Sequence, residues 1–252
     1  MDGKTLDVIA TVIECCEDPR GRKVGHPRAE TMRVLKSLRR FVREGTPWRS
    51  QTATADKVSG STLRRRLMGW AAAGVLGRVH VMLVSMLRGH PDLILDSCSV
   101  RAKRGGDLTG PNPTDRGKQG TKYHIAVDGD GIPVACAATG ANVNDTSMFE
   151  RLFRTAFAVM VRVGTVFADK GYDAEQHRVL CRSFGVEPRI HKRGQPHGSG
   201  LGQRRWPVER TNAWLLENKR LALRYDRIGD IIQSLLQSAC IFVVAGRVAQ
   251  EL

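Results

Sequence analysis

Three acidic residues lie either directly after an apolar run or on a predicted helix, where their carboxylates could do chemistry. Asp96 follows Leu93-Ile94-Leu95, Asp169 ends the apolar run 164–168, and Glu209 lies on a predicted helix behind a basic loop. Carboxylates that converge repel one another unless cations lie between them. Two divalent ions about 3.5–4 Å apart would activate a water or a 3′-hydroxyl at a phosphodiester and stabilise the leaving oxygen. Mg²⁺ is the expected ion, because it prefers oxygen ligands and accepts phosphate oxygens from a substrate.

Each of these carboxylates also fits a purely structural role. Asp96 is typical of a turn after a strand, Asp169 can cap the turn 170–172, and Glu209 can pair with Arg205 one helical turn earlier. A chain with 25 acidic residues contains many such triples. Spacing alone therefore leaves the catalytic and the structural interpretations open.

The order of the predicted elements brings the three carboxylates together. Hydrophobic periodicity predicts, in order, strands at 93–100, 122–128 and 132–137, a helix to about 161 that Asn144-Asp145-Thr146 can cap, a strand at 164–169, a helix at 173–183, a strand at 186–190, and helices at 204–222 and 228–249. This β-β-β-α-β-α-β-α order predicts an α/β fold, a ribonuclease H-like mixed sheet flanked by helices. The first and fourth strands of that fold are neighbours, so Asp96 and Asp169 project from one end of the sheet and Glu209 closes the cluster.

The beginning of the chain predicts helices only. Apolar residues recur near 3.6-residue spacing from 26 to 45, a short helix is predicted at 51–58, and a further helix at 62–73 ends at Gly74. Two short helices across the turn at 59–61 are typical of a helix-turn-helix.

In that interpretation, Arg64, Arg65 and Arg66 occupy the first turns of a recognition helix. An all-helical cap with an exposed basic face is the alternative. We predict two domains, a small all-α, helix-turn-helix-like DNA-binding domain at 1–90 and a catalytic domain at 91–252.

Positive charge is concentrated in two parts of the chain. There are 40 Lys and Arg against 25 Asp and Glu, a net charge of +15, and the isoelectric point is near 10.2. Residues 1–90 carry 17 basic and 8 acidic side chains, residues 91–188 carry 12 of each, and residues 189–252 carry 11 and 5. This distribution indicates a polyanionic partner such as nucleic acid. A basic surface that serves only solubility is the alternative.

The loop 191–203 leads directly into the helix with Glu209. It holds Lys192 and Arg193, many glycines and no apolar run. It buries too little to offset a backbone entropy of about 1–2 kcal/mol per residue. We expect the loop to be mobile without DNA and ordered on binding, so that Glu209 reaches its position in the complex.

Cysteine spacing and hydropathy exclude other classes of protein. The six cysteines show no C-x-x-C pattern and no histidine at ligand distance, so we expect no zinc site. No apolar segment follows Met1, and the longest apolar run, 239–246, is far shorter than a membrane span. We therefore expect a cytoplasmic protein with reduced thiols and no membrane partner.

Four blocks of sequence carry a family resemblance. LILDSCSVRAKRGG, TKYHIAVDGDGIPVACAATGANVNDTSMFERLF, VFADKGYDAEQHRVL and RRWPVERTNAWLLENKRLALRYDR resemble successive motifs of bacterial insertion-sequence DDE transposases, over about residues 26–248. The resemblance implies that Asp96, Asp169 and Glu209 are the catalytic residues and hold two Mg²⁺ ions, with Mn²⁺ as a substitute. It also implies double-stranded DNA as the partner, both terminal inverted repeats and target, a homodimer on DNA, and association with the bacterial nucleoid.

The resemblance is incomplete around Glu209. Many relatives surround this residue with a Tyr–Arg–Glu–Lys signature, and here Arg205 holds the Arg position, Gly202 the Tyr position and Leu216 the Lys position. Lys219 or Arg220 can supply the missing charge from the same helix face. We predict that Arg205, Lys219 and Arg220 contact DNA.

Other residues and functions remain open at this stage. Trp206 and Trp214 flank Glu209 and fit either core packing or stacking on an unpaired base, and His124 fits the core or the surface better than the substrate site. A DNA-binding protein that has lost catalysis and a nuclease that cleaves without joining are the alternative functions. Three intact carboxylates argue against the first, and the sequence does not separate the second from a transposase.

Overall fold

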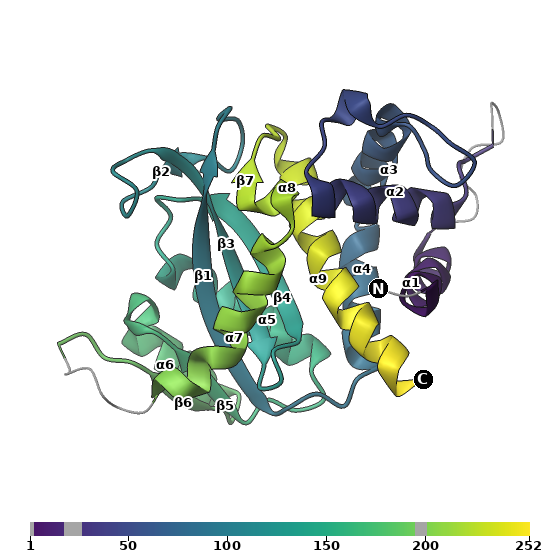
Figure 1. Cartoon of the computed structure of the whole chain (residues 1–252). Helices are drawn as coiled ribbons and strands as arrows, with labels where there is room; N and C mark the ends of the chain where they lie inside the picture. The colour runs from purple at the N-terminus through teal and green to yellow at the C-terminus, as the bar shows by residue number, and fades with distance from the viewer. Residues whose placement is uncertain (1–2, 18–26, 195–200) are drawn as a thin grey trace.

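The computed structural model describes residues 3–17, 27–194 and 201–252, and for 201–203 it describes the backbone only (Figure 1). A mixed sheet lies at the centre of the part that follows residue 90. Its strands are β1 (Asp92–Ala102), β2 (Gly110–Pro111), β3 (Gln119–Asp128), β4 (Pro133–Gly140), β5 (Thr165–Ala168), β6 (Glu187–Ile190) and β7 (Leu223–Arg224).

The strand β1 is central to this sheet. It pairs antiparallel with β3 and parallel with β5, while β4 lies antiparallel outside β3 and β6 lies parallel outside β5. The resulting order, β4-β3-β1-β5-β6, is that of a ribonuclease H-like sheet and confirms the predicted fold. The short β2 pairs with the start of β3, and β7 pairs with the last residues of β1.

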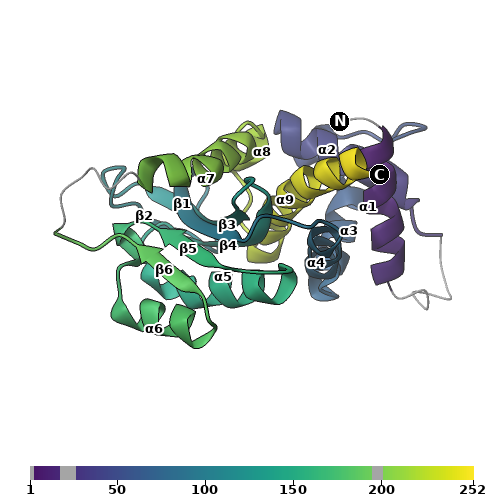
Figure 2. The same cartoon turned by 90° about the horizontal axis from the view of Figure 1, so that it is seen from below.

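Helices cover both faces of the sheet. Figure 2 shows α5 (Thr146–Val159) and α6 (Glu175–Ser183) on one face and α7 (Leu201–Leu216) on the other. A strand covered on both faces buries successive side chains rather than alternate ones. This explains why Leu93, Ile94 and Leu95 of β1 are all buried.

The N-terminal part is helical, as predicted, but its elements differ from the prediction. It contains α1 (Gly3–Cys16), α2 (Thr31–Glu44), the 3₁₀ turn η1 (Trp48–Ser50), α3 (Gly60–Ala72) and α4 (Val75–Ser85). The sequence interpretation missed α1 and α4. Gly74 closes α3 as predicted: the helix ends at Ala72, and the left-handed backbone of Gly74 (φ 62°) then turns the chain into α4 with a bend of 74°.

The helix predicted at 51–58 is wrong. This stretch is non-helical, and Arg33 of α2 donates from Nη2 to the carbonyl oxygens of Thr54 (2.7 Å) and Lys57 (3.2 Å). A long-range side chain thus takes carbonyl groups that a helix would use for its own hydrogen bonds. The next helix, α3, begins close to the predicted position, and Ser59 caps it by accepting a hydrogen bond from the backbone N–H of Thr62.

The long helix α9 (Gly229–Glu251) joins the two parts of the molecule. It packs against α1, α3 and α4 on one side and β4 on the other, and one buried apolar cluster extends through all of them. Its length and composition would suffice for a membrane span, but 72% of its most apolar window is buried inside the molecule. It is therefore best explained as a core helix. The short α8 (Lys219–Ala222) connects α7 to β7.

Candidate active site

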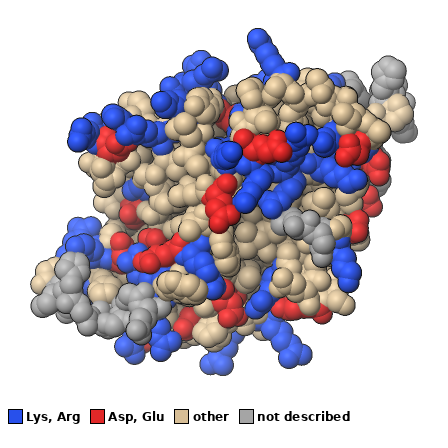
Figure 3. Space-filling view, in the orientation of Figure 1, with Lys and Arg blue, Asp and Glu red and all other residues tan. Residues whose placement is uncertain are grey.

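The parallel pairing of β1 with β5 places two of the predicted carboxylates side by side. Leu95 pairs with Ala168, so Asp96 and Asp169 follow directly on neighbouring strands. Both are half-buried and line a hollow of about 720 Å³. Figure 3 shows acidic side chains gathered left of centre, over the region of β1, with basic side chains above and below. The sheet thus produces the juxtaposition that the strand order predicted.

The third carboxylate approaches from α7. Glu209 is exposed and makes no hydrogen bond or ion pair with any residue that the structure describes. The alternative role predicted for it, an ion pair with Arg205, is not formed. Its negative charge nevertheless acts on Asp96 together with that of Asp169. Glu209 therefore lies near enough to influence Asp96, but it is not among the described residues that line the hollow with Asp96 and Asp169.

One face of α7 also holds Asp96 in place. Arg205 Nη2 donates to Asp96 Oδ1 (3.1 Å), and Asn212 Nδ2 donates to Asp96 Oδ2 (3.2 Å). These residues flank Glu209 at i−4 and i+3, so all three share a face of the helix. Asn212 was missed by the sequence interpretation, and the only signal for it was this helical spacing. Arg205 lies in the site, where it binds a carboxylate.

Asp96 carries the strongest electrostatic signature of the cluster. Its pKa is raised to about 6, chiefly by burial; Arg205 opposes the rise, and the charges of Asp169 and Glu209 add to it. Tyr172 lies beneath the cluster with a fully buried ring, and its hydroxyl has no hydrogen-bond partner in the described part of the chain. Burial and the charges of Asp145, Asp96 and Asp169 raise the pKa of Tyr172 well above its usual value.

Asp169 does cap the turn after β5, as the structural interpretation predicted. Its Oδ1 accepts from the backbone N–H of Gly171 (2.8 Å), at the start of η2 (Lys170–Tyr172). Only one of its oxygens is used in this way, so capping and metal binding are compatible. The same turn is tightly packed at Gly171, because a Cβ at this position would lie 2.8 Å from Asp169 Oδ1 and 3.1 Å from Asp145 Oδ2.

A fourth acidic residue, Asp145, lines the same hollow and was missed as a site residue. The sequence suggested a helix cap, but its side chain makes no capping bond to α5. Instead Oδ1 accepts from Ser97 Oγ (2.9 Å) and Lys122 Nζ (3.1 Å). His124 lies below them, fully buried, with its pKa lowered to about 4 chiefly by desolvation. This confirms a core position for His124.

The donor set has the chemistry of a site for hard divalent cations, because it presents carboxylate oxygens and no thiolate or imidazole at the surface of the hollow. The described residues do not, however, contain three or more Asp, Glu, His or Cys side chains already arranged around one ion position. The Arg205 guanidinium is the cation that contacts Asp96 in this structure.

The basic residues predicted to contact DNA fall into two groups. Two of the eight side chains are largely buried in ion pairs, and the other six are wholly or partly accessible. The accessible side chains are those of Arg64, Arg65, Lys192, Arg193, Lys219 and, at 22% exposure, Arg205. The loop predicted to order on DNA binding lies partly outside the described residues, since 195–200 are not described.

Two of the residues predicted to contact DNA have partners within the molecule. Arg220 is 5% exposed, and both its Nε and Nη2 donate to Asp226 at 2.8 Å. Arg66 pairs with Glu17 (2.9 Å) and lies over the ring of Trp70, with 13% of its side chain exposed. In both pairs the partner acid is not signalled by helical spacing, which is why the sequence alone did not reveal them.

The core-packing interpretation of the two tryptophans of α7 is also wrong. Trp206 is 55% and Trp214 39% exposed. Arg210 lies between them, with its guanidinium carbon 4.3 Å and 4.9 Å from the two ring centroids. The solvent face of α7 therefore carries a stacked Trp–Arg–Trp row beside Glu209.

Comparison with known proteins identifies the family of this chain. The family described as transposase DDE domain matches residues 87–242, more than half of the chain. The chain therefore belongs to the transposase DDE domain family, and it is a DNA transposase, an enzyme class that cuts and joins DNA. Divalent metal ions are the general cofactors of this family.

Two proteins of Burkholderia cepacia are similar to this chain. The protein provisionally assigned as the transposase for insertion sequence element IS402 is 42% identical over 167 residues, which cover 62% of this chain and 79% of that protein. The uncharacterized 16.2 kDa protein of the same element is 31% identical over 116 residues, covering 42% and 79%. These relatives agree with the resemblance to insertion-sequence transposases.

Among solved structures, a synaptic complex of piggyBac transposase with hairpin DNA matches at 8% identity and a TM-score of 0.48. The match covers all of this chain and 67% of that one. A likeness of this size supports no argument about function. The family assignment depends on the matched domain and the relative from Burkholderia cepacia.

Proposed function

We propose that this transposase cleaves the ends of an insertion sequence and joins them to target DNA by two-metal-ion phosphodiester chemistry at Asp96, Asp169 and Glu209. The observation that supports this most directly is the pairing of β1 with β5, which puts Asp96 beside Asp169 while Glu209 approaches from α7. Mg²⁺ is the proposed cofactor, with Mn²⁺ as a substitute. When bound, the ions would activate the attacking hydroxyl and stabilise the leaving oxygen.

The chain's own residues prepare the ligands. Arg205 and Asn212 each bond one oxygen of Asp96, which fixes the plane of its carboxylate before a substrate arrives. The backbone N–H of Gly171 donates to one oxygen of Asp169 and so restrains that carboxylate. Such partners orient ligating groups, and their loss typically lowers metal affinity or activity by about 10–100-fold. We assign Asn212 and Arg205 as positioning residues for Asp96.

DNA contacts are proposed for the accessible basic residues. Arg64 and Arg65 lie on α3, Lys192 and Arg193 follow β6, and Lys219 begins α8. Their substrates would be terminal inverted repeats and target duplex, and the synapsis of two ends implies two copies of the chain on DNA. We propose separate DNA-binding and catalytic roles for 1–90 and 91–252; their boundary falls between α4 and β1, while α9 of the second part completes the apolar core of the first. We propose action in the bacterial cytoplasm, at the nucleoid.

One assay distinguishes the transposase from both alternatives. The chain is incubated with Mg²⁺, a labelled duplex that carries one end of its element, and a target plasmid. A joined product supports the proposal, a cut product without joining indicates a nuclease, and a shifted band alone indicates a DNA-binding protein without catalysis. Addition of EDTA is expected to abolish both cutting and joining while the shifted band persists, and activity that persists in EDTA would exclude the metal mechanism.

A further inference from the structure

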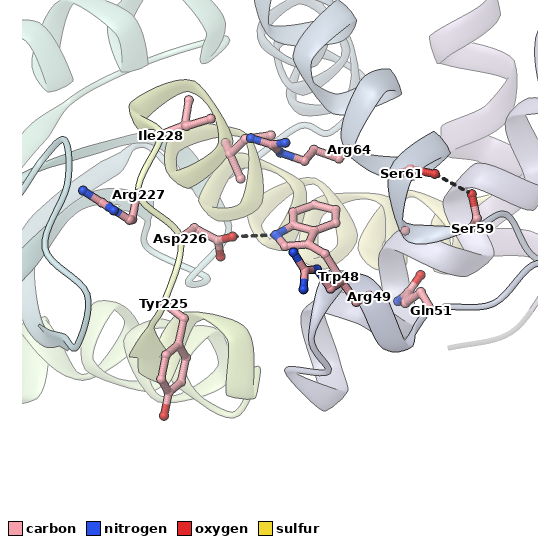
Figure 4. A pocket seen from close by; sticks show the side chains of 12 residues that line it. Trp48, Arg49, Gln51, Ser59, Ser61, Arg64, Tyr225, Asp226, Arg227 and Ile228 are labelled. Atoms are coloured by element: carbon pink, nitrogen blue, oxygen red, sulfur yellow. Dashed lines mark hydrogen bonds between the residues drawn. The ribbon is translucent and has the colours of Figure 1, made fainter.

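A second cavity lies where the helical part meets the catalytic part. It measures about 650 Å³ and is lined from one side by η1 and the start of α3, and from the other by residues 225–231, which lead into α9 (Figure 4). We call it the arginine cleft, because Arg49, Arg64 and Arg227 line it. Nothing in the chemistry proposed for the carboxylates explains this cavity.

The arginine cleft carries unpaired positive charge. Arg49, Arg64 and Arg227 are exposed, and none of them forms an ion pair or a side-chain hydrogen bond with a residue that the structure describes. The acidic side chain among the cleft-lining residues, Asp226, is already neutralised. Its Oδ1 accepts from Trp48 Nε1 and Arg220 Nη2, and its Oδ2 from Arg220 Nε, each at 2.8 Å. The cleft therefore presents three positive charges to a ligand.

The walls of the cleft are fixed before any ligand binds. Trp48 packs on Phe41 with ring centroids 4.1 Å apart, and Arg220 lies over the ring of Phe41 at 4.3 Å. A Cβ at Gly60 would lie 1.9 Å from the carbonyl oxygen of Trp48, so only glycine allows η1 and α3 to approach this closely. A rigid site loses little conformational entropy on binding.

Residues that line the arginine cleft follow closely in the chain on residues that line the carboxylate hollow. Ala222 and Leu223 line the hollow, and Tyr225 begins the lining of the cleft. Extended chain advances about 3.3–3.6 Å per residue, so Leu223 and Tyr225 are about 7 Å apart. Tyr225 is 42% exposed at this boundary. Asp96 lies six residues of β1, about 20 Å, from Ala102, which pairs with Arg224. A strand with a phosphate at Asp96 and Asp169 would therefore reach the cleft after about six nucleotides.

We propose that the arginine cleft binds the phosphate backbone of the DNA strand that leaves the carboxylate hollow, with Tyr225 stacked on a base or sugar. Guanidinium groups match phosphate geometry through paired hydrogen bonds, and an exposed aromatic ring supplies a stacking surface that a base can use. An acidic peptide would satisfy the arginines but would leave no role for Tyr225 at the junction with the hollow. This inference rests on the proposed function, because it assumes that the scissile phosphate lies at the carboxylates.

Salt dependence of DNA binding tests the role of the cleft charges. The variant Arg49→Ala/Arg64→Ala/Arg227→Ala is compared with Arg151→Ala/Arg162→Ala/Arg189→Ala, which removes three exposed arginines outside the cleft and the hollow. Removing one arginine–phosphate interaction lowers the slope of log K against log salt by about 0.9, so a fall of up to about 2.7 is expected for the cleft variant. An unchanged slope, or an equal fall in the control, would overturn the proposal.

Crosslinking tests the path of the strand. The variant Tyr225→p-benzoylphenylalanine is irradiated on a duplex that carries one element end, in Ca²⁺ and then in Mg²⁺. We expect a crosslink about six to eight nucleotides from the cleaved phosphate, since the carboxylates and the cleft are separated by about 20 Å of β1 and phosphates of one strand advance about 3.4 Å along the duplex. A crosslink elsewhere, none at all, or its disappearance when poly-glutamate is added at the same charge concentration would contradict the proposal.

The two proposals fail in different ways. If Asp96→Asn and Asp169→Asn retain cleavage, the proposed function is wrong whatever the arginine cleft binds. If those variants lose cleavage while the cleft variant keeps the wild-type salt slope, the carboxylate site stands and the proposed strand path is wrong.

Discussion

The two sides of the candidate active site are built in different ways. On the sheet side, Asp96 and Asp169 occupy positions set by strand register, and each has hydrogen-bond partners. On the helix side, Glu209 is exposed and has no partner among the described residues. The difference shows that the sheet fixes two of the proposed ligands, while the position of the third depends on where α7 lies.

The position of α7 is itself held by specific hydrogen bonds. Thr211 Oγ1 donates to the carbonyl oxygen of Gly131 (2.6 Å), and Arg210 Nη2 donates to that of Asp130 (2.6 Å), in the turn between β3 and β4. Val208 and Leu215 of the same helix are buried against the sheet. These interactions orient the face with Arg205, Glu209 and Asn212 toward β1. The variants below test how independent the two sides are.

The largest effect is expected from removing a ligand charge. Asp96→Asn, Asp169→Asn and Glu209→Gln should each lower the rate of strand cleavage by about three orders of magnitude or more, as in other enzymes that lose a central catalytic group. DNA affinity in a gel-shift assay should change little, because the basic surfaces remain. If Glu209→Gln cleaves at the wild-type rate, the third ligand is another residue, and Glu217 on the turn after α7 is the next candidate to test.

A smaller effect is expected from the residue that joins the two sides. Asn212→Ala removes the bond to Asp96 Oδ2 and should lower the cleavage rate about 10–100-fold, with a weaker apparent affinity for Mn²⁺ measured by its paramagnetic resonance. Asn212→Gln, which keeps the amide, should recover part of the activity. A variant with lower stability but wild-type Mn²⁺ affinity would show that Asn212 only packs α7 against the sheet.

Asp96→Asn should lower cleavage activity but raise the stability of the metal-free protein. The folded-state pKa of Asp96, about 6, lies above its ordinary value of 3.8, so the ionised carboxylate destabilises the metal-free protein at pH 7. Asp96→Asn in EDTA should therefore raise the free energy of unfolding by about 1–2 kcal/mol. The measurement is urea denaturation of both proteins.

The stability difference between the wild type and Asp96→Asn should depend on pH. A raised folded-state pKa means that the wild type gains stability relative to Asp96→Asn as the pH falls from about 6 toward 3.8, because the folded state then binds the extra proton. The advantage of the variant should therefore shrink over that range. A constant difference across it would indicate that Asp96 does not titrate as the structure implies.

The smallest effect is expected where space is tight. Gly171→Ala puts a Cβ within 3.1 Å of oxygens from Asp169 and Asp145, so one of them must move by a few tenths of an ångström. Shifts of this size in a ligand should lower the cleavage rate several-fold, up to about tenfold. The control is Gly69→Ala, which should leave the cleavage rate unchanged because a Cβ at Gly69 has no neighbour within 4 Å.

Much of the catalytic part was predictable because its signals are local. The apolar run before Asp96, the strand that ends at Asp169 and the helix with Glu209 each have a clear pattern, and the order of strands brings them together. Asn212 was not predictable, since an amide on a helix has no pattern that distinguishes a buried partner from a surface residue. Asp145 was misread for the related reason that an acidic residue before a helix usually caps it.

The helical part was harder to predict because its partners are distant in the sequence. Arg66 and Arg220 look like free surface charges until Glu17 and Asp226 are placed beside them. The stretch 51–58 looks helical until Arg33 bonds its carbonyl groups. In each case a tertiary interaction overrides the local pattern, which no count of spacing can anticipate.

The packing of α9 affects the order in which the chain can fold during synthesis. Residues 229–251 emerge from the ribosome after every other described element, yet α1, α3 and α4 bury their apolar faces against them. The first helices therefore wait through about two hundred further residues, roughly 10–40 s of translation at 5–20 residues per second, before their core is complete. A nascent chain would thus lack the finished junction between the two parts, and with it the assembled DNA-binding surface, until translation has passed residue 251.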